Sequence, residues 1–110
     1  MKVQNLKQQL SEGKPIVLID VRDADEITAE PYFVHPPKNY LNIPILSLLF
    51  ASKTELEEKI FTHLNIPFST PMVTFFRSGG RSARACEKLL QYGWKTKNLE
   101  GGVEAWGQSV

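Results

Sequence analysis

The chain has 110 residues, of which 42% are hydrophobic and 23% are charged, which is typical of one globular domain rather than of a disordered or membrane-spanning chain. Its 13 Lys and Arg against 12 Asp and Glu give a formal net charge of +1, so neither nucleic acid nor an acidic membrane is expected as a partner. The single cysteine excludes an internal disulfide, and a polar start without an apolar run of ~20 residues predicts a cytoplasmic location.

In the N-terminal half, helical and strand patterns alternate. Val3, Leu6 and Leu10 recur at helical spacing before Gly13, which predicts a helix that ends near the glycine. The apolar run IVLID, residues 16–20, is typical of a strand buried on both faces. One or two helical turns are expected within residues 23–30. A proline-rich irregular loop over 31–40 follows, and then a short strand in YLNIP, residues 40–44.

The C-terminal half continues the alternation. Ser52 followed by Glu55 predicts a capping box, which opens a helix with Leu56, Ile60 and Leu64 on one face. The further elements that we predict are a strand in MVTFF (72–76), a helix that stops at Gly93, a strand in KTKNL (95–99) and a short helix from GGVEAW (101–106), whose Trp106 can pack back on the body of the domain. This order predicts an α/β fold with a mainly parallel sheet, as one domain over residues 1–110.

Polar residues follow two of the predicted strands. Asp20 and Arg22 end the first strand, and the segment Phe76 to Arg81 ends the third. Ligands of parallel sheets bind beyond the carboxyl ends of the strands. We therefore expect the functional site at this edge.

The turn after the third strand has the features of an anion pocket. Ser78, Gly79 and Gly80 allow successive backbone N–H groups to converge, and the helix that follows adds its positive N-terminal end. Sulfate, thiosulfate or phosphate are the small anions that we expect there. An ordinary two-glycine turn is the alternative, and a nucleotide P-loop is excluded because its Lys-Ser/Thr is missing. The predicted anion-binding loop comprises Phe76, Arg77, Ser78, Gly79, Gly80, Arg81 and Ser82.

Four segments resemble, in order, those of a single-domain rhodanese of the sulfurtransferase superfamily: IVLIDVRDADE, LNIP, VTFFRSGGRSARACEKLLQYGW and NLEGGVEAW. The resemblance spans nearly the whole chain and implies a small parallel sheet flanked by helices on both faces. It also implies sulfur transfer through a persulfide on a cysteine just before RSGGRS, where this sequence has Phe76. The loop has the length of the sulfurtransferase branch and is shorter than that of the related phosphatases.

The residues near the loop offer few substitutes for the missing thiol. Cys86 is the only cysteine, and because it shares a helical face with Leu89 and Leu90 we predict a buried core residue. A reactive serine at position 78 or 82 would need a base, for which His35 is the conceivable partner, although it is expected to be a loop residue. His63 is expected at the surface. No His, Cys or Asp grouping has metal-ligand spacing, so neither a metal nor another cofactor is predicted.

The resemblance further implies that Asp20 and Arg22 brace the loop. We expect the Asp20 carboxylate to pair with Arg77 and Arg81, and we expect the acidic residues around it to be solvated. Phe76 either fills the pocket as a plug or forms an apolar floor beneath open N–H groups. A Phe at this position excludes a persulfide there.

Three hypotheses of function remain. The favoured one is a rhodanese-like pseudoenzyme that lacks thiosulfate sulfurtransferase activity and acts as an anion-binding or regulatory module. The second is a sulfur carrier that uses Cys86. The third is a structural domain that binds a protein partner through Phe75 and Phe76.

Overall fold

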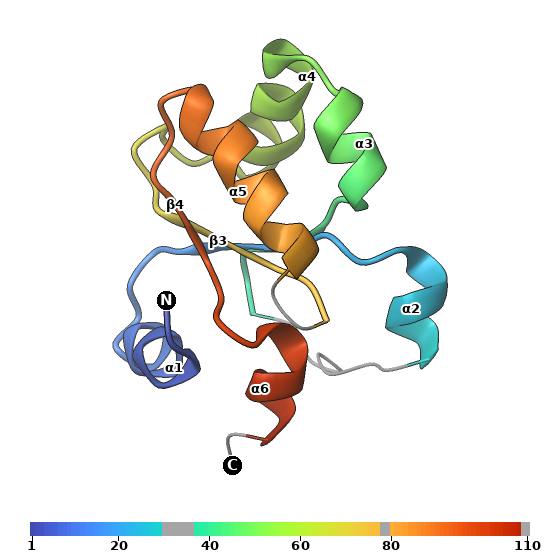
Figure 1. The fold of residues 1–110 in the computed structure, drawn as a ribbon. Coiled ribbons are helices and arrows are strands. Elements are labelled where there is room, and N and C mark those ends of the chain that lie inside the picture. The colour runs from blue at the N-terminus through green and yellow to red at the C-terminus, as the bar shows by residue number, and fades with distance from the viewer. Residues whose placement is uncertain (30–36, 78–79, 109–110) are drawn as a thin grey trace.

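The computed structural model describes residues 1–29, 37–77 and 80–108 of the chain (Figure 1). Strands and helices alternate along it, as the sequence predicts. Their bounds in chain order are α1 Val3–Ser11, β1 Val17–Asp20, α2 Ala24–Ala29, β2 Tyr40–Asn42, α3 Ile45–Phe50, α4 Lys53–Glu57, the π-helix η1 Glu58–Thr62, β3 Met72–Phe75, α5 Gly80–Gln91, β4 Thr96–Asn98 and α6 Gly102–Gln108.

The described strands form one sheet in the order β2-β1-β3-β4, and every pair in it is parallel. The register places Asp20, the last residue of β1, opposite Asn42 on one side and Phe75 on the other. Thr74 of β3 lies opposite Asn98. The carboxyl ends of all the strands therefore meet at one edge, which confirms the predicted α/β fold.

Helices cover both faces of the sheet. Figure 1 shows α1 and α6 on one face and α3, α4 and α5 on the other. Each face has its own hydrophobic core because side chains of a strand point alternately to the two sides. The core under α1 and α6 contains Val3, Leu6, Ile16, Leu18, Val73, Phe75, Leu99 and Val103. The core under α3 to α5 includes Val17, Ile19, Leu48, Leu56, Ile60, Phe61, Phe76, Ala85, Leu89 and Trp94.

Several local predictions are confirmed. Ser52 and Glu55 form the expected reciprocal capping box. Gly13 and Gly93 have φ of 76° and 87° just after α1 and α5, a region that favours glycine. Trp106 packs against the core under α1 and α6, and the Lys7 ammonium lies 4.8 Å from its ring centroid. His63 is exposed, as expected.

Other features differ from the prediction. Helix α3 was not expected, because its six residues lack an amphipathic pattern. Its Leu46 and Phe50 side chains are exposed. Leu90 is 50% exposed, unlike the buried Cys86 and Leu89, because it lies about 100° around the helix from Leu89, at the edge of the buried face. Most of the predicted loop over 31–40, including His35, lies outside the described residues. Within the described part of the chain, every helix is too short or too polar to cross a bilayer.

Candidate functional site

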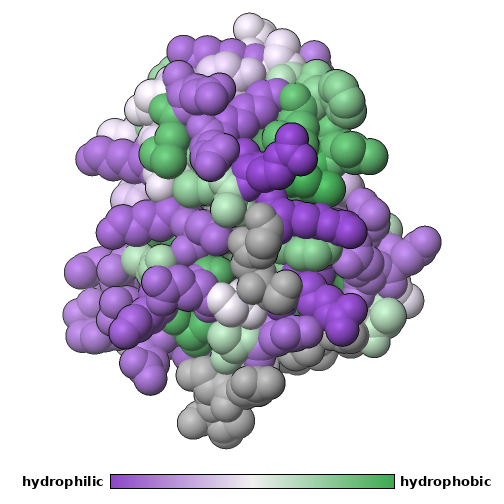
Figure 2. Space-filling model, viewed as in Figure 1, coloured by the Kyte–Doolittle hydropathy of each residue, from purple (hydrophilic) through white to green (hydrophobic). Residues whose placement is uncertain are grey.

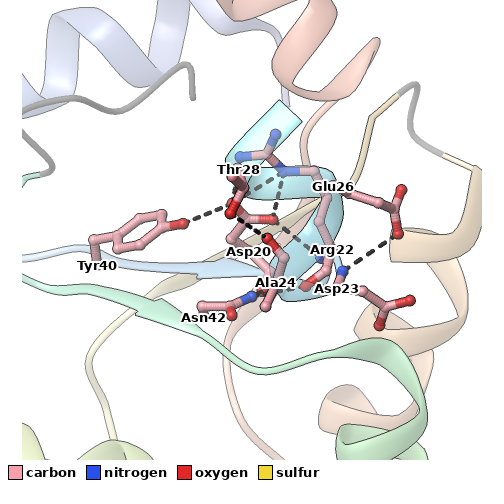
Figure 3. Close-up of polar contacts among 8 residues, drawn as sticks. All are labelled: Asp20, Arg22, Asp23, Ala24, Glu26, Thr28, Tyr40 and Asn42. Atoms are coloured by element: carbon pink, nitrogen blue, oxygen red, sulfur yellow. Dashed lines mark hydrogen bonds and ion pairs between the residues drawn. The ribbon is translucent and has the colours of Figure 1, made fainter. Parts of the chain in front are cut away.

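A buried ion pair lies at the end of β1. Asp20 is fully buried and Arg22 is 2% exposed. The Asp20 carboxylate accepts hydrogen bonds from Arg22 Nε at 3.0 Å and from Arg22 Nη2 at 2.8 Å, and also from the Arg22 backbone N–H at 3.1 Å (Figure 3). Burial alone lowers the pKa of Arg22, but the hydrogen bond and charge of Asp20 outweigh it, so the net pKa is raised. The guanidinium is therefore held charged inside the fold.

Two residues of β2 complete this cluster. The Tyr40 hydroxyl donates to Asp20 Oδ2 at 2.7 Å. The Asn42 side-chain amide donates to the backbone carbonyls of Asp20 and Arg22 at 2.9 and 2.8 Å, as Figure 3 shows. Burial raises the pKa of the Tyr40 phenol, and the hydrogen bond and charge of Asp20 raise it further. Sequence reasoning did not identify Tyr40 or Asn42, because no local motif indicates which β2 side chains face β1.

The expected pairing of Asp20 with Arg77 and Arg81 is wrong. Asp20 pairs with Arg22, two residues along its own chain. Arg77 pairs instead with Glu104 of α6, with 3.0 Å between Arg77 Nε and Glu104 Oε1, and both side chains are well exposed. Arg22 and Tyr40 already satisfy the Asp20 carboxylate, so it does not need a partner from the end of β3. Asp20 is also an exception to the expected solvation of the acidic stretch, in which Asp23 and Asp25 are exposed.

Phe76 lies at the end of β3 and packs into the core under α3 to α5, with 8% of its surface exposed. The Arg81 guanidinium carbon lies 4.8 Å from the centroid of its ring, on the side toward α5. Phe75 is fully buried in the opposite core. The hypothesis that Phe75 and Phe76 mark a partner surface is therefore wrong. The assignment of Phe76 to the position of a catalytic cysteine stays a prediction.

The first turn of α6 holds the backbone of residues 76 and 77. The Val103 N–H donates to the Phe76 carbonyl at 2.8 Å, and the Glu104 N–H donates to the Arg77 carbonyl at 3.2 Å. Gly102 has φ of 58° and lies so close to the Phe76 backbone carbonyl that no side chain fits at this position. The two glycines of LEGGVEAW are the sequence signal of this contact, although their pattern alone predicts only the start of a helix. We find that the first turn of α6, rather than the Asp20 side chain, forms hydrogen bonds with the first two residues of the loop.

The Ser82 side chain, in the first turn of α5, forms a hydrogen bond within the fold. Ser82 is fully buried, its hydroxyl donates to Asn98 Oδ1, and its carbonyl accepts from Thr74 Oγ1 at 3.1 Å. These bonds join the first turn of α5 to β3 and β4. The helix begins at Gly80. Ser78 and Gly79 lie outside the described residues, so the predicted convergence of N–H groups stays a prediction.

A small hollow of about 120 Å³ lies beside Arg77 and is lined by Arg22, Glu26, Ala29 and Arg77. Two guanidinium groups and one carboxylate therefore border it. Glu26 is partly directed elsewhere, since its Oε1 lies 3.3 Å from the Asp23 backbone N–H that donates to it (Figure 3). The volume of the hollow and its two guanidinium groups suit a small oxyanion.

Cys86 lies in α5 and is 7% exposed, as the sequence predicts. Burial raises the pKa of its thiol, while a hydrogen bond with the Thr74 side chain acts in the opposite direction. A thiol with a raised pKa is a poor nucleophile. Among the residues that the structure describes, no group of three or more His, Cys, Asp or Glu is arranged to hold a metal ion.

Comparison with known proteins gives a consistent result. The model of the rhodanese-like domain family matches residues 2–109. The putative sulfurtransferase YtwF of Bacillus subtilis is 30% identical over 103 residues, covering 92% of this chain and 82% of YtwF. The adenylyltransferase and sulfurtransferase UBA4 of Meyerozyma guilliermondii is 35% identical over 95 residues, but this chain spans only 20% of its length. The human single-domain sulfurtransferase TSTD1 has a similar fold, with a TM-score of 0.74 at 22% identity over 100% of this chain and 96% of TSTD1.

Proposed function

Because the chain belongs to the rhodanese-like domain family, we propose that it is a member without sulfur transfer through a loop cysteine, which acts as an anion-binding or regulatory module. The observation that carries the proposal is the side chain of Phe76, the first residue of the loop. Phe76 has no nucleophilic atom, and its ring is buried in the core with Arg81 stacked on it. In this proposal Phe76 occupies the position of the family's persulfide-forming residue.

Cys86 is a weak substitute for that residue. Only 7% of the surface of the residue is exposed, and burial raises the pKa of its thiol. Attack on thiosulfate requires a thiolate that the substrate can reach. The sulfur carrier hypothesis would therefore need α5 to move away from the sheet.

The anion-binding part of the proposal rests on the hollow beside Arg22 and Arg77. Asp20 holds the buried Arg22 guanidinium in one orientation, so no side-chain entropy remains to be lost there when an anion binds. Arg77 lies at the rim, where its exposed pair with Glu104 can open at little cost. In this view Arg22, which Asp20 holds in place, and Arg77 shape the hollow.

The decisive experiment is an assay of thiosulfate:cyanide sulfur transfer, together with intact-mass measurement after thiosulfate treatment. We expect no turnover above background and no adduct of one sulfur atom. Turnover that Cys86→Ala abolishes would instead establish the sulfur carrier. Thiosulfate-dependent turnover that survives Cys86→Ala would show that a different group transfers sulfur, and the proposal would fail as well.

The anion site is tested by titrating sulfate, thiosulfate and phosphate at constant ionic strength while following backbone amide shifts. We expect saturable shifts at Arg22 and Arg77, which line the hollow, and these shifts should weaken in Arg77→Gln. Lys53→Gln is the matched control, because Lys53 is exposed on α4 and does not line the hollow. Unchanged amide shifts at both arginines would leave a scaffold without an anion site.

A further inference from the structure

Helix α3 exposes large apolar side chains. Leu46 is 64% exposed and Phe50 is 84% exposed, and residues four apart lie on the same face of a helix. Figure 2 shows hydrophobic atoms gathered over α3, directly beside the strongly hydrophilic side chains that border α5. Adjacent exposed apolar residues of this size commonly mark an interaction site.

A groove of about 310 Å³ runs between α3 and the first turns of α5. It is lined by Asp23, Ile45, Leu46, Leu49, Arg81 and Arg84, and we call it the α3–α5 groove. One wall is thus apolar and the other carries two exposed guanidinium groups three residues apart. Neither Arg81 nor Arg84 forms an ion pair with a residue in the described part of the chain.

The two walls are held together by Lys88. Its ammonium donates to the backbone carbonyls of Leu49 and Ala51 at the end of α3, with 2.7 Å to the Ala51 oxygen. This interaction satisfies carbonyls that the end of a short helix leaves open. Lys88 therefore serves the fold, whereas the charges of Arg81 and Arg84 face the groove. A groove with fixed walls loses little entropy when a partner binds.

We propose that the α3–α5 groove binds a short acidic segment of a partner protein, in which bulky apolar side chains lie next to carboxylates. The apolar side chains of that segment cover Leu46 and Leu49 in the groove and the neighbouring exposed Phe50. Its carboxylates pair with Arg81 and Arg84, as guanidinium groups favour. The single carboxylate of Asp23 leaves the groove with a net positive lining, which disfavours basic segments.

The α3–α5 groove adjoins Phe76, the first residue of the loop. Arg81 lines the groove and also stacks on the Phe76 ring. A bound segment would therefore reach the mouth of the loop without entering the hollow beside Arg22 and Arg77. The proposal goes beyond the anion-binding function and does not depend on it, because the two sites are lined by different residues.

The test uses a fluorescently labelled peptide with Leu and Phe four residues apart among Asp and Glu. Binding to the full chain is followed by fluorescence anisotropy, and sedimentation velocity gives the oligomeric state. We expect saturable binding that weakens by at least ~10-fold with Arg84→Glu and with Phe50→Ser. Lys53→Glu and Leu90→Ser are the matched controls for charge and for exposed apolar surface, and both should bind as the unchanged chain does.

Three results would overturn the proposal. The first is equal or stronger binding of a peptide in which Lys replaces every Asp and Glu. The second is absent binding, or binding that Arg84→Glu and Phe50→Ser leave unchanged. The third is a dimer that Phe50→Ser dissociates, which would assign the groove to contact between two copies of this chain.

Discussion

Gly102 faces Phe76 so closely that a Cβ built on the glycine would lie 2.2 Å from the Phe76 carbonyl oxygen. The same position has φ of 58°, which L-residues with a side chain rarely adopt. The Val103 N–H then reaches that carbonyl at 2.8 Å. One glycine therefore lets the first turn of α6 lie directly against residues 76 and 77, which begin the loop.

We predict that Gly102→Ala lowers the free energy of unfolding by about 2–4 kcal/mol, because backbone strain and a backbone clash add together. Urea denaturation followed by circular dichroism measures the loss. Gly13→Ala is the matched control, since Gly13 has φ of 76° but an added Cβ would meet nothing within 4 Å. It should cost about 1 kcal/mol from strain alone. Equal losses in the two variants would contradict the close approach of α6.

The buried pair of Asp20 and Arg22 makes a second prediction. Asp20→Asn leaves the Arg22 guanidinium, which is 2% exposed, without its compensating charge. We expect the free energy of unfolding to fall by about 3–5 kcal/mol. Equilibrium urea unfolding of the variant and the unchanged chain measures this difference.

Glu104→Gln is the control for that measurement. It removes the carboxylate of the Arg77 ion pair, whose side chains are 60% and 41% exposed. Exposed pairs contribute about 0–1 kcal/mol, so we expect a small loss. A loss from Asp20→Asn no larger than that from Glu104→Gln would mean that the Arg22 guanidinium reaches water.

The sheet and most helices could be predicted from local patterns. The continuous apolar run of β1 and the glycines after α1 and α5 each determine an element within a few residues, because burial and positive φ act locally. Helix α3 could not be found in this way. It is held by Lys88, whose ammonium comes from a helix far along the chain, and only the tertiary structure brings the two together.

At the site, the sequence identified the strand ends but not their partners. Asp20 and Arg22 were expected at the edge of the sheet and lie there, yet the pairing expected for Asp20 was wrong. Which carboxylate meets which guanidinium depends on side-chain directions and register. Tyr40 reaches Asp20 only because β2 pairs with β1 in the observed register.

Stability should fall at alkaline pH because of Tyr40. Burial first, and then the hydrogen bond and charge of Asp20, raise the pKa of its phenol in the folded state. Above about pH 10 the unfolded chain loses this proton while the folded chain keeps it. The folded state then binds more protons, so the free energy of unfolding decreases as pH rises, whereas below pH ~10 the contribution is fully present.

Urea unfolding measured across the alkaline range tests this prediction. Tyr40→Phe should be less stable near neutral pH, because the hydrogen bond to Asp20 is lost, and should lose less further stability above pH ~10. Tyr92→Phe is the control for the loss of one phenol and should retain the steep alkaline decrease. Parallel alkaline curves for Tyr40→Phe and the unchanged chain would mean that the phenol ionises equally in both states.

Phe76→Cys should give the chain sulfurtransferase activity. The hydrogen bonds from α6 to residues 76 and 77 involve only backbone carbonyls, so they survive the change of side chain. Without the ring, the Arg81 guanidinium faces the new thiol and favours its thiolate. The variant should lose about 3 kcal/mol of stability to the cavity that the ring leaves.

The experiment is made in a Cys86→Ala background, so that only one thiol is present. Intact mass after thiosulfate treatment should show one added sulfur atom, and the thiosulfate:cyanide assay should show turnover. Phe76→Ala in the same background is the control, because it creates the cavity without a thiol and should remain inactive. If the cysteine is alkylated readily but neither gains sulfur nor turns over, the backbone beyond Arg77 does not stabilise a persulfide. Phe76 would then be one of several changes that separate this chain from its sulfur-transferring relatives.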